Sequence, residues 1–218
     1  MKRQATRPKH IKKAVFVLVW LLLAVGTITF FVRHESAIDL GVESEEQTVT
    51  STEPDPDESK ENAVNYQWRG ANQEPKKLKI PSIAVDTYIQ KMGIDTQSRI
   101  AVPTNIHLSG WYQGSVLPGQ DGIAVIVGHV TGKYEDGIFK NISSLKKGDE
   151  ITLEMGSGAS IRYQVLNVIK VPEKNATNYL FSAEKGVAKQ LNLITCGGEF
   201  DKVLNQYEDR IIVSSKEI

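Results

Sequence analysis

The sequence is poor in cysteine and histidine and has no excess of charge of either sign. Its 218 residues include 1 Cys and 4 His, which excludes a disulfide within the chain and any Cys-rich zinc module. Neither an HExxH motif nor a Cys/His ligand spacing is present, so we expect no metal and no other cofactor. Lys+Arg and Asp+Glu number 26 each, and no broad basic surface indicates nucleic-acid binding. Hydrophobic residues make up 40%, which excludes a chain that is disordered throughout.

The charges are nevertheless segregated along the chain. Residues 1–33 carry seven Lys or Arg and no acid, whereas residues 34–62 carry ten acids and one Lys. The remaining residues, 63–218, hold 18 bases and 16 acids. The N-terminal part therefore differs in character from the nearly neutral bulk of the chain.

A single long apolar run near the N-terminus indicates a membrane anchor. Residues 14–32 (AVFVLVWLLLAVGTITFFV) contain no charge, and a helix of this length, rising about 1.5 Å per residue, nearly crosses a hydrocarbon core of about 30 Å. The basic residues 1–13 precede the run and acids follow it. This predicts a single-pass protein of the cell membrane with a cytoplasmic N-terminus and an extracellular domain. The alternative is a cleaved signal peptide, but the apolar run is long for one and no small-residue cleavage site follows it.

Residues 33–73 have the composition of a flexible tether. The stretch is acidic and polar, and it contains Pro54 and Pro56 but few large apolar residues. Such a segment cannot bury enough apolar surface to fold, and its like charges extend it. We expect it to hold the following domain away from the membrane; an interaction tail is the alternative.

Residues 74–218 are predicted to form one all-β domain. Short runs rich in β-branched residues alternate with turn signals, and helical periodicity is scarce. Strands are expected over 78–83, 85–92, 123–127, 150–155, 161–171, 191–195 and 210–213, with short helices over 142–147 and 182–189. This density favours a closed or nearly closed β-barrel of about eight strands over βαβ units.

Cys196 is the first candidate for chemistry. It follows the apolar strand 191–195 and precedes Gly197 and Gly198, which would let a substrate backbone approach closely. A lone cysteine can also be an inert buried residue. An unpaired thiol on an exported domain is open to oxidation, however, which favours a reactive role.

Two further residues stand where apolar strands begin or end. His129 follows the buried run 123–128, and Arg210 opens the last apolar strand. A structural imidazole and a solvated cap are the respective alternatives. His107, in the loop 103–110, is the second candidate for a base.

Together these residues resemble the sortase family of membrane-tethered cysteine transpeptidases. Leu193-Ile194-Thr195-Cys196 matches the family's Leu-x-Thr-Cys signature, Gly128-His129 its histidine element, and Arg210 with the following strand its closing arginine strand. Four further segments are most similar to class F sortases: residues 78–86, 110–112, 118–119 and 195–201. In class F the arginine often lies just after a tyrosine of the closing segment, whereas Glu208 stands there in this chain, a spacing closer to other classes.

The resemblance implies a reaction and a role for each residue. The Cys196 thiolate would attack the Thr–Gly carbonyl of an LPxTG-like sorting signal in an exported protein, and an amine on a peptidoglycan precursor would resolve the thioacyl-enzyme. His129 would transfer protons and Arg210 would hydrogen-bond the oxyanion. The implied substrate-binding residues are Ile194, Thr195 and Gly197.

The residues alone leave two alternatives open. Water could resolve the same intermediate, which would make the protein a membrane-anchored cysteine protease. The domain could also be a non-catalytic surface β-barrel that binds a partner, and Cys196 would then be dispensable.

Overall fold

The computed structural model describes residues 55–203 and 206–218. The predicted membrane helix over 14–32 and residues 33–54 of the predicted tether lie outside the described residues. Within the described part, no helix is both long enough and apolar enough to cross a membrane.

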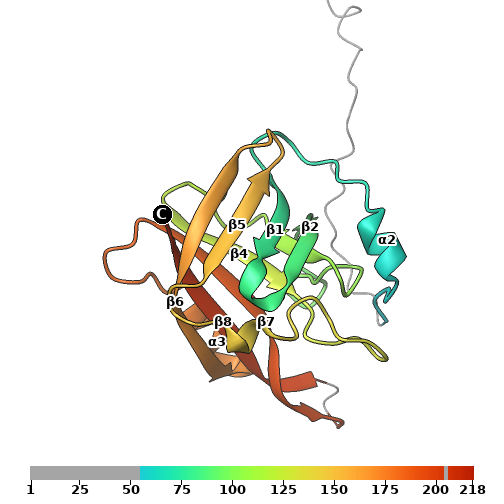
Figure 1. Ribbon diagram of the computed structural model, residues 1–218. Helices are drawn as coiled ribbons and strands as arrows, with labels where there is room; N and C mark the ends of the chain where they lie inside the picture. Colours follow the sequence, from blue (N-terminus) through green and yellow to red (C-terminus); the bar gives the residue numbers. More distant parts are fainter. Residues whose placement is uncertain (1–54, 204–205) are drawn as a thin grey trace, which may run out of the picture. The chain divides into compact units, whose positions relative to one another are not determined.

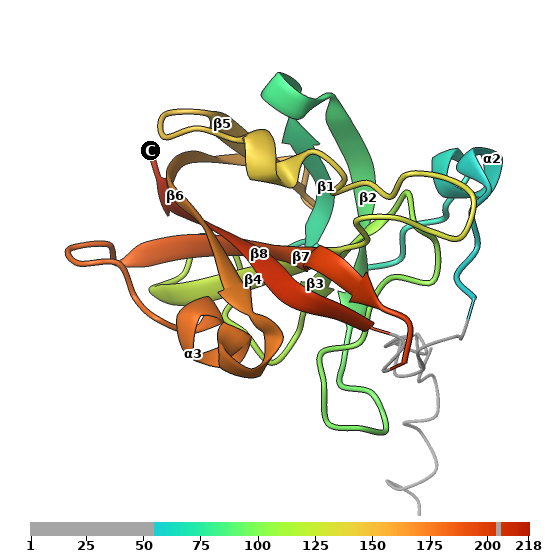
Figure 2. The same ribbon diagram turned by 90° about the horizontal axis from the view of Figure 1, so that it is seen from below.

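Eight strands form a closed barrel, shown from two directions in Figure 1 and Figure 2. In chain order they are β1 (Pro75–Ile80), β2 (Val85–Met92), β3 (Ser109–Tyr112), β4 (Gly122–Gly128), β5 (Glu150–Met155), β6 (Ser160–Pro172), β7 (Lys189–Asp201) and β8 (Gln206–Glu217). Their order around the barrel is β1-β2-β3-β4-β7-β8-β6-β5. The β2–β3 and β4–β7 pairs are parallel and the other pairs are antiparallel. The predicted all-β barrel of about eight strands is confirmed.

Helical material is limited to short segments in the connections. These are α2 (Lys60–Val64), η1 (Pro81–Ile83), η2 (Ile142–Ser144), η3 (Glu173–Asn175) and α3 (Ala176–Leu180). The predicted helix over 142–147 is a single 3-10 turn, and the one over 182–189 is wrong. There the chain makes a turn in which Val187 N–H donates to Glu184 O and Gly186 has φ 78°, outside the helical region.

Two strand predictions also need correction. The strand expected over 78–83 ends at Ile80, because Pro81 begins η1 and its fixed φ suits the first position of a helical turn. Strand β3 was not predicted, since its four residues include Gly110 and are too few to show an alternating pattern.

Successive residues of the central strands are buried on two different faces of the sheet, one inside the barrel and one outside it. The interior of the barrel is filled by fully buried side chains such as Leu78, Ile126, Leu193 and Val213. Successive side chains of a strand point to opposite faces, so their neighbours in sequence lie outside the barrel. There a second apolar cluster forms on β4, β7 and β8 and is covered by α3. It includes Val125, Val127, Ala176, Leu180 and Ile212, with Ile194 packed against it.

The segment before β1 belongs to the folded domain. Helix α2 starts after Ser59, whose hydroxyl accepts a hydrogen bond from Asn62 N–H, and Asp57 pairs with Asn105 in a parallel bridge. The ring of Tyr66 packs against Tyr88 at a centroid distance of 5.9 Å. The flexible tether predicted to reach residue 73 is therefore shorter, because its last part carries caps and aromatic rings that dock on the barrel.

Candidate active site

Three strands bring the predicted site residues together at one end of the barrel. Strands β4 and β7 are parallel, with Val127 level with Ile194, so the end of β4 lies beside the part of β7 that leads into Cys196. Strands β7 and β8 lie side by side (Figure 2) and are antiparallel, and their register pairs Cys196 directly with Arg210. Residues far apart in the sequence thus meet through strand pairing.

The alternation of side chains places two of the three predicted catalytic residues, Cys196 and Arg210, on the outer face, since residues two apart in a strand share a face. His129 directly follows the last residue of β4, and all three residues lie two positions along the chain from a residue of the outer apolar cluster. These three neighbours are Val127, Ile194 and Ile212. The cluster therefore forms an apolar floor beside the thiol, the imidazole and the guanidinium.

Cys196 is a half-buried free thiol next to charged groups. Burial raises its pKa above the usual 9.0. The positive charges of Arg210 and Arg99 oppose this change, while the nearby carboxylate of Glu173 adds to it. The thiol is therefore mostly protonated at neutral pH.

His129 is held by one hydrogen bond, and no carboxylate of residues 55–203 or 206–218 forms an ion pair with it. Its Nε2 lies 2.8 Å from the carbonyl oxygen of Pro103, which can only accept, so Nε2 carries a proton. Burial lowers the pKa of the imidazole below the usual 6.5, and this hydrogen bond opposes the shift. The ring is thus neutral at neutral pH, with Nδ1 as its proton acceptor.

Arg210 is anchored rather than solvated. Its Nη1 donates to the carbonyl oxygens of Tyr207 and Asp209, both at 2.9 Å. Its Nη2 lies 3.7 Å from Oε1 of Glu173, and 17% of the side chain is exposed. A guanidinium held in this way can present a fixed charge beside the thiol, as an oxyanion donor requires.

His107, the second candidate for a base, is engaged elsewhere. Its Nε2 lies 3.0 Å from Glu58 O and 3.6 Å from Oε2 of Glu135. No contact links it to Cys196 or Arg210 among residues 55–203 and 206–218. The strand topology therefore favours His129.

The residues next to Cys196 hold strand β7 against its neighbours β4 and β8. Thr195 faces the barrel interior, is 4% exposed, and its Oγ1 donates to Gly128 O at 2.8 Å, which ties β7 to the end of β4. A Cβ on Gly197 would lie 2.8 Å from Cγ1 of Ile211. Gly198 has φ 76°, and a Cβ there would lie 2.5 Å from Oδ2 of Asp209. The two glycines are thus required by packing within the β7–β8 hairpin, a reason that the sequence analysis did not foresee.

Two charged neighbours of the thiol were missed from the sequence. Glu173 comes just after β6, whose residue Val171 pairs with Arg210, and Arg99 lies in the loop between β2 and β3. Neither belongs to a motif. Glu173 comes close to Cys196 only because β6 pairs with β8, and no local sequence pattern predicts that pairing.

The charge of Glu173 gives a direct prediction. We expect Glu173→Gln to lower the pKa of Cys196, because it removes a carboxylate that raises this pKa and releases Arg210 from its ion pair. The rate of iodoacetamide alkylation as a function of pH should shift toward lower pH. Glu199→Gln, at an exposed position of the same hairpin, is the matched control and should leave the profile unchanged. A Glu173→Gln profile identical to the wild type would contradict the assignment.

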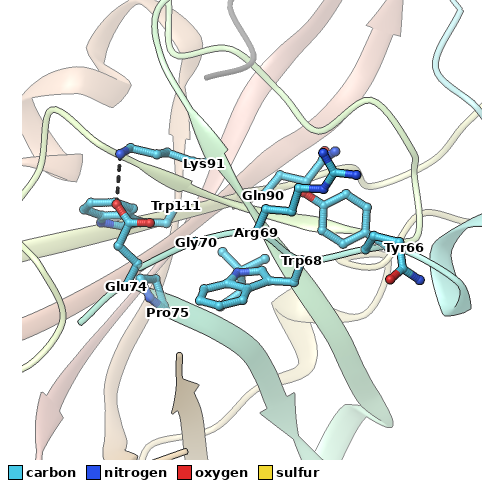
Figure 3. Close-up of a pocket in the computed structure, with 11 residues that line it drawn as sticks. Tyr66, Trp68, Arg69, Gly70, Glu74, Pro75, Gln90, Lys91 and Trp111 are labelled. Carbon is cyan, nitrogen blue, oxygen red and sulfur yellow. Dashed lines mark hydrogen bonds and ion pairs between the residues drawn. The ribbon is translucent and has the colours of Figure 1, made fainter. Parts of the chain in front are cut away.

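A cavity lies apart from these residues, between the N-terminal segment and strands β2 and β3 (Figure 3). Its volume is about 350 Å³, and its walls include Tyr66, Trp68 and Trp111. An ion pair between Lys91 Nζ and Glu74 Oε1, 2.8 Å long, lines one side. Among residues 55–203 and 206–218, no group of three or more His, Cys, Asp or Glu side chains could hold a metal ion.

Comparisons with known proteins identify the family and the fold. A sortase domain model matches residues 78–218. Sortase A from Corynebacterium diphtheriae shares 24% identity over 69% of this chain, with a TM-score of 0.50, and the match spans 63% of that protein's length. A Clostridium perfringens sortase D5 transpeptidase shares 22% identity over 71% of this chain and 84% of its own (TM-score 0.50). Listeria monocytogenes sortase A shares 18% over 67% of this chain and 88% of its own (TM-score 0.50).

No curated protein matches the sequence. The structural likenesses establish the fold, and the family model covers more than half of the chain, including the histidine, the cysteine and the arginine of the site. The chain belongs to the sortase family of transpeptidase enzymes.

Proposed function

We propose that the protein is a membrane-anchored cysteine transpeptidase. Its substrate is an exported protein with an LPxTG-like sorting signal, which it cleaves between Thr and Gly and joins to an amine of a cell-wall precursor. The observation that carries the proposal is the pairing of Cys196 with Arg210 across β7 and β8, with His129 following the end of the neighbouring strand β4. The anchor over 14–32 would keep the enzyme where the substrate and the acceptor meet.

The first half of the reaction forms a thioester. The Cys196 thiolate attacks the Thr carbonyl carbon, and the guanidinium of Arg210 stabilises the negative charge on the carbonyl oxygen. The C–N bond to Gly breaks, and the imidazolium of His129 gives its proton to the leaving amine. The N-terminal part of the substrate remains bound to the sulfur.

The second half transfers the acyl group to the acceptor. The amine attacks the thioester carbon, neutral His129 takes the proton that the amine loses, and the C–S bond breaks to restore the thiolate. The product contains a new amide bond, and the imidazolium and thiolate are ready for another cycle.

The resting protonation state limits the rate. Burial raises the pKa of Cys196 and lowers that of His129, so most molecules hold a neutral thiol and a neutral imidazole. Only a minority carry the thiolate with the imidazolium that the first step needs. We therefore expect a slow turnover, with a plateau of kcat/KM between the two pKa values.

The substrate contacts remain predictions. Ile194 belongs to the apolar floor, where it can contact an apolar side chain of the sorting signal, and Gly197 lies beside the thiol. Thr195 is proposed as a substrate contact by its place in the motif, although its hydroxyl is bonded to Gly128 O. Assignment to class F likewise remains a prediction.

Trapping the intermediate tests this function. Incubation with an LPxTG peptide should add the mass of the N-terminal fragment to the peptide that contains Cys196, as read by mass spectrometry. An added amine nucleophile should divert the product from the hydrolysed acid to the amide. Hydrolysis that is insensitive to the amine would instead identify a protease, and the absence of any adduct across a peptide library would argue for a binding module.

A further inference from the structure

The loops around His129 are joined by a short piece of the N-terminal segment, residues 57–60, which we call the strap. In Figure 2, helix α2, which begins at Lys60, lies beside these loops. Asp57 N–H donates to Thr104 O, and Ile106 N–H donates to Asp57 O, both at 2.9 Å. The amide of Asn105, which is 4% exposed, donates to Oδ2 of Asp57 and to Ser59 O at 2.9 Å each. The strap is therefore bonded to the loop that precedes β3.

Glu58 bonds the strap to the loop that follows His129. Its carboxylate accepts hydrogen bonds from three consecutive backbone amides: those of Lys133 at 2.5 Å, Tyr134 at 3.0 Å and Glu135 at 2.9 Å. Bonds from backbone amides to an ionised carboxylate are stronger than neutral ones. Lys60, the last residue of the strap, adds an ion pair to the same loop, with its Nζ 2.8 Å from Oε2 of Glu135.

The loop is shaped to receive this carboxylate. A Cβ on Gly132 would lie 2.7 Å from Cδ and Oε1 of Glu58 and 3.0 Å from Cδ1 of Ile106. Only a residue without a side chain leaves room there, so Gly132 and Glu58 form one contact.

The two loops bonded by the strap are those that hold the imidazole. The first carries Pro103, whose carbonyl oxygen is the hydrogen-bond partner of His129 Nε2. The second begins at His129 itself and returns so that Phe139 N–H donates to His129 O at 2.9 Å. Ile138 N–H donates to Ile106 O at 2.8 Å and links the two. A shift of either loop would therefore move the ring or its partner.

We propose that the strap is a positioning element of the active site and that Glu58 is a positioning residue for His129. Glu58 does not touch the substrate; it fixes the loop whose first residue is the proton-transfer group. This inference rests on the proposed function for its kinetic consequence, but the structural link between Glu58 and the loop is independent of it.

The test compares Glu58→Gln with Glu61→Gln in the full chain. Glu61 lies in the first turn of α2, is exposed, and forms no side-chain hydrogen bond or ion pair within residues 55–203 and 206–218. Glu58→Gln should lower kcat for an LPxTG peptide about tenfold with KM unchanged, because a small misplacement of a catalytic group lowers the rate of the chemical step. Hydrogen exchange of the amides in 131–137, measured without substrate, should become faster. Glu61→Gln should behave as the wild type in both measurements.

Gly132→Ala tests the same contact between Gly132 and Glu58 by changing the loop residue instead of the carboxylate. We expect a similar loss of kcat, and the double variant should be no slower than either single variant, since the contact can be lost only once. Unchanged kcat in Glu58→Gln, with or without faster exchange, would overturn the positioning role. Unchanged exchange would overturn the strap itself. A wild-type chain that forms no adduct on Cys196 would refute the proposed function but leave the exchange result to decide the strap.

Discussion

Cys196→Ala is expected to abolish cleavage of the sorting signal and formation of the acyl adduct. The proposed reaction has no other nucleophile, because this is the only cysteine in the chain. Without the thioester, neither half of the reaction can proceed. Product formation followed by mass spectrometry should fall to the level of the enzyme-free control.

The fold should survive this change. Cys196 is half-buried on the outer face and forms no disulfide, so alanine removes one sulfur atom at the edge of the outer cluster. A thermal midpoint close to that of the wild type would separate loss of chemistry from loss of structure. Full cleavage by a folded Cys196→Ala protein would rule out the mechanism proposed here.

His129→Gln is expected to lower kcat/KM about 10²- to 10⁴-fold, the usual contribution of a general acid and base. Glutamine can still donate to Pro103 O, the partner of the ring, so local structure is retained while proton transfer is lost. Rates measured with the same peptide and amine provide the comparison. His107→Gln is the matched control and should lose far less, since its ring lies against Glu58 O and Glu135 and transfers no proton in the proposed reaction.

The pH profile adds a second test of His129. In the wild type, the plateau of kcat/KM should extend from below 6.5 to above 9.0, because burial lowers the pKa of the imidazole and raises that of the thiol. Activity falls on the acid side as the thiolate form gives way to protonated thiol with imidazolium, and on the alkaline side as the imidazolium is lost. In His129→Gln the plateau and the alkaline fall should both be lost, and the residual activity should rise with pH as the thiol ionises, levelling off only above the raised pKa of Cys196. An unchanged bell-shaped profile would assign the acid limb to another group.

Much of the barrel could be predicted from the sequence because its strands carry local signals. Continuous apolar runs such as 123–127 and alternating ones such as 150–155 match β4 and β5 closely. Strand β3 and helix α3 could not be predicted, since four and five residues give no periodicity and their formation depends on tertiary contacts.

The candidate site shows the same division. Cys196, His129 and Arg210 could be named because each belongs to a motif or ends an apolar strand. Glu173, Arg99 and the strap could not, because their roles depend on pairings between distant segments. An acidic stretch such as residues 55–62 reads as solvated chain, and only the loops it contacts reveal that part of it is folded.

The alternation along β7 has a consequence for how the enzyme can vary. Thr195 supports the barrel from within while Cys196, the next residue, carries the chemistry outside. Removal of one residue from this strand would therefore exchange the two sets, turning the sulfur inward and a core side chain toward the peptide. Evolution and protein engineering can change the identity of the outward residues one at a time, but they must conserve the number of residues between Leu191 and the reactive sulfur.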